Sequence, residues 1–353
     1  MEPTAAPAVT ARIPPSAEHW PQRVSGLAAL PRLLAQQGVA SAGILGAAGL
    51  APDALSGPEK SISFAGGARA LSEATRMSNC PHFGLRVGQQ TRLADLGSVG
   101  AMMQAAPSVG AALRTFAEHQ RRISTGGAVF LQEHGRTVSL GYAVFHPEVG
   151  RLGPIYDTAA GAAVSLMHEL CDEEWAPGEV LLPHRRSSDA RQFEQVFRCP
   201  LRFDAEHFAM NFPAAVMDRP LQRRLGAHLP TPAGPDAAPS EADLLPQLYR
   251  SLRLLLLQGG AAGAQSARAL EMSQRTLGRR LEVLGVGFRQ VLDDLRFGLA
   301  RGLLGETDLP VVDIALTLGY AEASPFVRAF KRWSGMSPLQ WRALQRSVDT
   351  ADV

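Results

Sequence analysis

A proline-rich break constrains the architecture of this chain more than any other feature of its sequence. Residues 229–240, with the sequence LPTPAGPDAAPS, contain four prolines and no apolar periodicity, so no helix or strand can continue through them. We expect a linker here, between a first domain of residues 21–228 and a second domain of residues 241–346. A chain of 353 residues, of which 46% are hydrophobic, has room for about two domains at a typical ~150 residues each.

The sequence shows no sign of export or membrane insertion. Residues 1–20 are rich in Pro and Ala and lack the cationic segment and apolar core of a signal peptide, so we expect a disordered tail. The longest aliphatic run, Leu254–Leu257, is far shorter than the roughly 20 apolar residues that a membrane span requires. We therefore expect a cytoplasmic protein with no membrane partner.

The spacing of cysteine and histidine residues indicates no metal site. Cys80, Cys171 and Cys199 are widely spaced, contain no CxxC pair and cannot form a complete disulfide framework. A redox-sensing thiol is an alternative, but it requires a lowered pKa, and no neighbouring residue suggests one. Residues 168–172 combine His, Glu, Cys and Asp, but apolar residues at helical intervals make this segment an amphipathic helix without zinc-ligand spacing.

The first domain mixes helical and strand patterns. Apolar residues at helical intervals predict helices within residues 27–39, 70–77 and 108–123. Residues 128–145 are typical of two strands around a tight turn at His134, Gly135 and Arg136. A further helix, a short strand, a helix and extended chain follow up to residue 213. The pattern predicts an α+β domain in which helices accompany an antiparallel sheet.

The second domain shows helical periodicity and almost no strand signal, and its first part is typical of a helix-turn-helix unit. Ser273 is well placed to cap a helix that follows a short helix ending near Met272. Arg275 and Arg279 project from one side of the capped helix. Leucines at i, i+4 and i+7 form the buried stripe on its other side: Leu277, Leu281 and Leu284.

The same pattern returns about fifty residues later. Gly319 allows a turn after one short helix, and Pro325, which is tolerated only in a first helical turn, marks the start of the next. Polar and basic residues at i, i+4 and i+7 lie opposite its apolar stripe of Phe326, Ala329, Phe330 and Trp333. These polar and basic residues are Ser324, Arg328 and Lys331.

A long helical stripe separates the two units. It runs from Phe288 to Leu303, about sixteen residues or roughly 24 Å at 1.5 Å per residue. Consecutive major grooves on one face of DNA lie about 34 Å apart, so the two units can occupy neighbouring grooves. The formal net charge is only +2, yet residues 328–346 carry five basic and no acidic side chains. This distribution favours a nucleic-acid partner.

Residues 265–342 resemble the DNA-binding domain of the AraC/XylS family, which has two helix-turn-helix units joined by a long helix. The resemblance rests on SQRTLGRRL, DDLRFGLARGLL and DIALTLGYAEASPFVRAFKRWSGMSPLQWR. It implies double-stranded promoter DNA as the ligand, RNA polymerase as a partner, and a homodimer. The base-facing positions that it implies are Arg275, Gly278, Arg279, Ser324, Pro325 and Arg328.

Two of these positions depart from the family pattern. Gly278 has no side chain where relatives often have a polar one, and Pro325 has no backbone N–H to donate. Base recognition should therefore depend on Arg275, Arg279 and Arg328, because arginine can bind guanine in a bidentate manner. We assign contacts to the DNA phosphates to Ser273, Arg280, Lys331 and Arg332.

Residues 27–225 resemble the arabinose-binding-like N-terminal domain found in one branch of this family. The resemblance rests on LPRLLAQQGV, on FGLRVGQQTRLADLGSVGAMMQAAPSVGAALRTF and on VFRCPLRFDAEHFAMNFP. It implies that the domain senses an effector, although the family label does not establish arabinose as the ligand. Polar residues in apolar settings are the candidates for contacting the effector: His119, Arg122, Tyr142, His146 and Tyr156.

We therefore expect a DNA-binding transcription regulator, an activator controlled by a small molecule, and no enzyme or cofactor. The GGAAG segment at Gly259 lacks a phosphate-loop ending, and no GxSxG motif is present. The alternative is a regulator whose N-terminal domain binds a protein instead of a small molecule. A closed apolar pocket would favour the first hypothesis, and a large exposed apolar patch without a cavity would favour the second.

Overall fold

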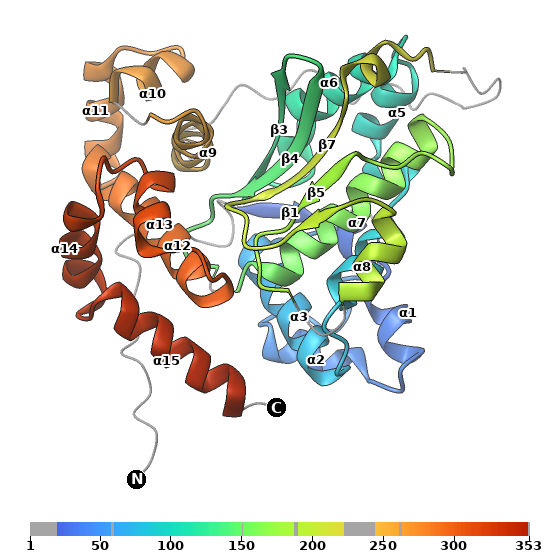
Figure 1. The fold of residues 1–353 in the computed structure, drawn as a ribbon, viewed down its shortest axis with the longest axis horizontal. Coiled ribbons are helices and arrows are strands. Elements are labelled where there is room, and N and C mark those ends of the chain that lie inside the picture. The colour runs from blue at the N-terminus through green and yellow to red at the C-terminus, as the bar shows by residue number, and fades with distance from the viewer. Residues whose placement is uncertain are drawn as a thin grey trace.

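The computed structural model describes residues 20–57, 60–149, 151–186, 190–221, 244–260 and 263–351 (Figure 1). Within these residues an α+β domain is followed by an all-helical domain, which confirms the predicted fold class. The expected linker, residues 229–240, lies outside the described residues, as do residues 1–19 of the expected tail. The domain boundaries therefore stay predictions.

A five-stranded sheet forms the centre of the N-terminal domain. Its strands lie in the order β3-β4-β7-β5-β6, and neighbours are antiparallel except β5 and β6, which are parallel. The predicted hairpin is confirmed, and Gly135 takes a φ of +61° in its turn, which glycine adopts without strain. The strands are β3 (Gly127–His134), β4 (Thr137–Val144), β5 (Glu179–Leu181), β6 (Leu201–Arg202) and β7 (Phe208–Pro213). A small sheet pairs β1 (Pro21–Arg23) with β2 (Ser61–Ser63).

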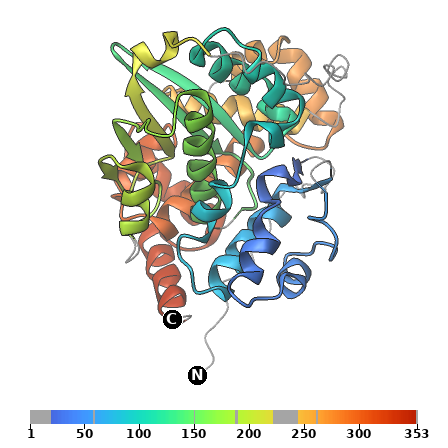
Figure 2. The same ribbon diagram turned by 90° about the vertical axis from the view of Figure 1, so that its right-hand side faces the viewer.

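Helices surround this sheet, and the longest of them in the domain is α7 (Gly153–Leu170). It packs against β7 and against α4 (Phe83–Gly88), while α6 (Val109–His119) contacts β3. Figure 2 shows α7 in front of the sheet, with the helical domain behind it. The remaining helices of this domain are α1 (Leu30–Ala35), α2 (Ser41–Ala47), α3 (Phe64–Met77), α5 (Ser98–Gln104) and α8 (Ala190–Phe197).

The C-terminal domain is a chain of helices arranged around one long helix, α12. Its aromatic core joins Phe297, Phe330 and Trp341, whose ring centroids lie 5.6–6.3 Å apart. The helices are α9 (Leu244–Leu257), α10 (Gly263–Ala269), α11 (Gln274–Val283), α12 (Phe288–Glu306), α13 (Val311–Thr317), α14 (Ala323–Ser334) and α15 (Pro338–Ala351). None of the helices in the described part of the chain is long and apolar enough to cross a membrane.

Within the described residues, two contacts between the domains stand out. At the first, α9 packs on β3 and β4 of the sheet. At the second, the end of α12 docks on the N-terminal domain, where Glu306 accepts hydrogen bonds from the backbone N–H groups of Leu152 and Gly153. Arg185 adds to this contact by donating to the carbonyl oxygen of Gly305 at 2.6 Å, and Arg301 donates to that of Pro147 at 2.7 Å.

Candidate DNA-binding surface and effector cavity

The first helix-turn-helix unit consists of α10 and α11. Ser273 caps α11, as predicted, because its hydroxyl accepts a hydrogen bond from the Thr276 N–H at 3.1 Å. The preceding helix ends at Ala269, earlier than expected, and Glu271 turns the chain with a φ of +54°. Leu277 and Leu281 are buried, whereas the predicted contact residues on the opposite face are exposed: Arg275, Arg279 and Arg280.

The second unit consists of α13 and α14. Gly319 makes the turn with a φ of +75°, and Pro325 lies in the first turn of α14, both as predicted. Phe326 and Phe330 are fully buried, while Ser324 and Arg328 are exposed on the other side. Each unit therefore presents a polar and basic helix face to solvent.

The long helix α12 holds the two units apart. Its 19 residues span about 28 Å at ~1.5 Å per residue. Arg296 fixes the second unit to this helix, because its Nε donates to the Leu318 carbonyl oxygen at 2.8 Å and its guanidinium lies 4.5 Å from the centre of the Tyr320 ring. Helix α12 therefore separates α11 of the first unit from α14 of the second.

Several of the basic side chains near the C-terminus form hydrogen bonds or ion pairs within the protein. Arg342 donates to the carbonyl oxygen of Leu309, and Arg346 is paired with Asp308. Arg332 forms an ion pair with Asp293 of α12 at 3.2 Å, although its side chain is half exposed. Among the basic residues of this segment, Arg328 and Lys331 are therefore the most available to DNA.

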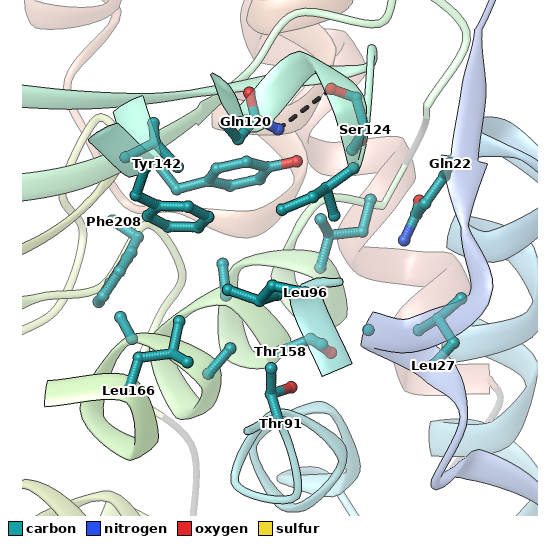
Figure 3. Close-up of a pocket in the computed structure, with 18 of the residues that line it drawn as sticks. Gln22, Leu27, Thr91, Leu96, Gln120, Ser124, Tyr142, Thr158, Leu166 and Phe208 are labelled. Atoms are coloured by element: carbon teal, nitrogen blue, oxygen red, sulfur yellow. Dashed lines mark hydrogen bonds between the residues drawn. The ribbon is translucent and has the colours of Figure 1, made fainter. Parts of the chain in front are cut away.

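The N-terminal domain contains an apolar cavity of about 140 Å³ between the sheet and α7 (Figure 3). Its wall comes from segments far apart in the sequence, including Leu27, Phe64, Leu96, Leu166 and Phe208. Gln120, Ser124 and Tyr142 lie together at one end, and the hydroxyl groups of Thr91 and Thr158 lie toward the other. The described wall contains no charged side chain, so it suits an uncharged ligand with an apolar body.

Of the five predicted effector contacts, only Tyr142 lines this cavity. His146 lies between the rings of Trp20 and Phe64, at centroid distances of 4.7 and 5.8 Å. The Tyr156 hydroxyl accepts from the Val144 N–H at 3.2 Å, and His119 Nδ1 lies 3.0 Å from the Thr115 carbonyl oxygen. Arg122 is not among the cavity residues either.

Burial determines the protonation state of two of these residues, His146 and Tyr142. It lowers the pKa of His146 to about 3, so this histidine is neutral, and it raises the pKa of Tyr142 well above its ordinary value. Gln120 lines the cavity but was not among the predicted effector contacts, although it lies directly after the predicted His119. The small residues of α7, such as Ala162 and Ala163, were a further signal, because a face without bulky side chains leaves room beside a helix.

A second, polar cavity of about 380 Å³ lies where the two domains meet at α3, α7, α12 and α15. Here His184 Nε2 lies 3.0 Å from the Asp157 carboxylate, and both side chains are largely buried. Burial acts to lower the pKa of His184, but the charge and hydrogen bond of Asp157 outweigh it and raise the pKa to about 9. Burial raises the pKa of Glu306 to about 7, against the two backbone hydrogen bonds that favour its charged form.

The His184–Asp157 pair predicts a loss of stability at alkaline pH. Because the pKa of His184 rises from an ordinary 6.5 to about 9, the folded protein binds this proton more tightly than the unfolded chain. The stabilisation is complete below pH 6.5 and is lost as the pH rises through 9. Urea unfolding between pH 6.5 and 9 should therefore give a falling free energy of unfolding, and His184→Gln should flatten this fall. His134→Gln, at the exposed hairpin turn, is the control, and an unchanged slope in His184→Gln would contradict the assignment.

The groups considered for metal or redox chemistry have structural partners. His168 Nε2 lies 3.0 Å from the Trp175 carbonyl oxygen, and Asp172 pairs with Arg219 at 3.6 Å. Burial raises the pKa of the Cys171 and Cys199 thiols to about 11, which opposes formation of the reactive thiolate.

Two helix-turn-helix units on a long helix, joined to a sensor-like domain with a cavity, define a DNA-binding transcription regulator. Comparison with known families agrees with this class. The arabinose-binding domain of AraC transcription regulators matches residues 38–221, and a helix-turn-helix domain matches residues 266–344. The chain belongs to the AraC family of transcription regulators, as its sequence motifs predict.

The chain is also similar to individual transcription regulators. The chain is 28% identical to the ornithine utilization regulator of Pseudomonas aeruginosa over 89% of its length and 94% of that protein. It is 25% identical to the regulator VirS of Mycobacterium tuberculosis, over 80% of this chain and 84% of VirS. The crystal structure of the regulator CdpR from Pseudomonas aeruginosa aligns with 78% of this chain and 91% of that one, at 27% identity and a TM-score of 0.39. The ornithine utilization regulator and VirS are transcription regulators and not enzymes, which confirms the prediction that this chain is not an enzyme.

Proposed function

We propose that this regulator controls transcription in response to a small, uncharged and mainly apolar effector that binds the cavity of its N-terminal domain. The observation that carries the proposal is the cavity itself, which is lined mainly by apolar side chains and has neutral hydrogen-bonding groups at its ends. It favours an effector-binding domain over a domain that binds only a protein partner. The large exposed apolar side chains in the described residues lie mostly on the helical domain instead, for example Val283 and Leu316.

The name of the ornithine utilization regulator does not identify the effector of this chain. Ornithine is charged at its carboxylate and at both amino groups, and burying charges requires opposite charges in the wall. The described cavity wall contains none. We therefore expect an effector of a different chemical class, one with an apolar body that can exchange a hydrogen bond with Gln120, Ser124 or Tyr142.

For DNA, we propose that Arg275 and Arg279 of α11 and Arg328 of α14 bind base edges. All three are exposed on the outer faces of these helices, as base recognition requires. Ser324 is exposed beside them, and Gly278 and Pro325 occupy base-facing positions without a side-chain donor. The proposed phosphate contacts are Ser273, Arg280, Lys331 and Arg332.

The remaining parts of the proposal follow from the family. We propose a homodimer that binds promoter DNA, contacts RNA polymerase, activates transcription, and works in the cytoplasm, where that DNA lies. Cooperative activation of a reporter promoter by the purified protein and RNA polymerase would test the positive sign of regulation. Lower transcription on addition of the protein would instead identify a repressor.

The effector site can be tested by filling the cavity. Ala163→Phe places a ring where the cavity lies, so it should abolish binding of an uncharged apolar probe such as Nile red. In the wild type, a ligand present at 100 times its Kd should stabilise the folded state by about 2.7 kcal/mol, measured as a higher Tm. Ala35→Phe, on the exposed surface of α1, is the matched control. Equal Nile red binding by wild type and Ala163→Phe would exclude this cavity as the site.

A further inference from the structure

One hydrogen bond connects the cavity to the helical domain. Gln120 lines the cavity, and its Oε1 accepts from Nη1 of Arg250 on α9 at 3.0 Å. Its Nε2 donates to the Ser124 carbonyl oxygen at 3.1 Å, the bond drawn in Figure 3. The carboxamide of Gln120 therefore lies between the space that an effector would fill and the first helix of the DNA-binding part.

The position of Arg250 depends on its hydrogen bond to Gln120, because Arg250 has only neutral acceptors in the described structure. Its second Nη donates to the Ala117 carbonyl oxygen at 3.1 Å, and no carboxylate among the described residues forms an ion pair with it. Burial, followed by the nearby charge of Arg121, lowers the pKa of Arg250, so the charged form is less stable here than in water. A guanidinium in this position that loses a hydrogen-bond acceptor has a lower free energy in water than in the domain contact.

Other buried polar groups of α9 lack hydrogen-bond partners. The Tyr249 hydroxyl, the Ser251 hydroxyl, and Nε and Nη1 of Arg253 are buried and have no hydrogen-bond partner within the described residues. Arg253 is only 1% exposed. On the facing domain, Nδ1 of His207 is buried without a partner as well, and burial lowers the pKa of His207 to about 3. Buried polar groups that lack partners oppose docking, so they weaken the contact between α9 and the N-terminal domain.

We propose that the Gln120–Arg250 bond is the trigger by which the effector releases α9 from the N-terminal domain. An effector that hydrogen-bonds to the Gln120 carboxamide removes the acceptor of Arg250, α9 leaves β3 and β4, and its unpaired groups become hydrated. Because α9 also packs on α10 and α12, its release frees the first recognition unit to adjust to DNA. The docked state described above is thus the autoinhibited one, and the proposal rests on the cavity being the effector site.

Trp20 reports whether α9 is docked. Its ring centroid lies 5.4 Å from that of Tyr249, and the side chain is 3% exposed. Release of α9 uncovers it, so its fluorescence should move to longer wavelength and its quenching by acrylamide should increase several-fold. Subtracting the spectrum of Trp20→Phe removes the contribution of the other tryptophans.

The test uses the full chain without any ligand. Gln120→Leu removes the acceptor and should expose Trp20, whereas Gln120→Glu keeps an acceptor, now charged, and should leave Trp20 buried. Adding Arg250→Met to Gln120→Leu replaces both partners by apolar groups and should restore quenching to the wild-type level. Arg268→Ala, an exposed arginine on the neighbouring α10, is the matched control.

The outcomes separate this proposal from the proposed effector site. Exposure of Trp20 in Gln120→Leu, reversed by Arg250→Met, supports the trigger whether or not Nile red binds. A Trp20 that stays buried in Gln120→Leu overturns it, even if Nile red binds to the cavity. Exposure that Arg250→Met does not reverse also overturns it, because general disruption of the domain would then be the cause.

Discussion

Replacing Arg279 and Arg328 together by alanine is expected to remove sequence preference from DNA binding while weak, salt-sensitive binding remains. Each arginine lies on a different recognition helix, and each bidentate contact to guanine is worth about 1–3 kcal/mol. The double variant should therefore lose about 2–6 kcal/mol of specific affinity, or roughly 30-fold to 20,000-fold. Arg280 and Lys331 remain exposed for phosphate contacts, which supply the salt-dependent part of the affinity.

The measurement is binding to the DNA upstream of the protein's own gene at two salt concentrations, with unrelated DNA for comparison. Arg191→Ala, an exposed arginine on α8 of the other domain, should behave as wild type. Retained sequence preference in the double variant would show that bases are recognised elsewhere. If the wild type shows no preference either, Gln120→Leu should be measured next, because it is expected to be released without an effector.

Replacing Gly88 by alanine is expected to destabilise the N-terminal domain strongly. Gly88 of α4 lies so close to α7 that a Cβ atom would be 2.1 Å from the Thr158 carbonyl oxygen and 2.7 Å from the Ala162 backbone nitrogen. These are backbone atoms of a helix, which cannot rotate away as a side chain can. The two helices must separate, at a cost typical of overpacked cores, about 1–3 kcal/mol or more.

The loss of stability in Gly88→Ala should appear as a lower midpoint of urea unfolding. Because α7 forms part of the cavity wall, Nile red binding should also be weaker. The control is Gly46→Ala in α2, where a Cβ atom would meet nothing within 4 Å. At this exposed helical position, alanine should stabilise by about 0.5–1 kcal/mol. A Gly88→Ala protein as stable as Gly46→Ala would mean that α4 and α7 are not packed as described.

The helical domain was largely predictable because its determinants are local. A cap such as Ser273, a turn glycine such as Gly319 and a first-turn proline such as Pro325 act within a few residues of the sequence. The apolar stripes that follow them have one helical period and must be buried together. The roles of the basic residues were less accessible, because Arg342 and Arg346 bind partners more than thirty residues away.

The cavity of the N-terminal domain could not be predicted residue by residue. Polarity in an apolar setting identified Tyr142, but it equally selected His146, which packs between two aromatic rings, and Tyr156, which satisfies a backbone N–H. A cavity is the space that several distant segments leave unfilled, and no single segment records it. The same holds for the bond between Gln120 and Arg250, which lie 130 positions apart.

The sequence by itself determined the family, the two recognition units and the division into an α+β and an all-helical domain, since periodicity, caps and turns are properties of neighbouring residues. Only the tertiary structure decided which face of each domain meets the other, where the cavity lies, and that Arg253 and Glu306 fall at the domain contact. Those features depend on packing between segments far apart in the chain, where the free energy of each contact is set by burial and by the partners that burial leaves available.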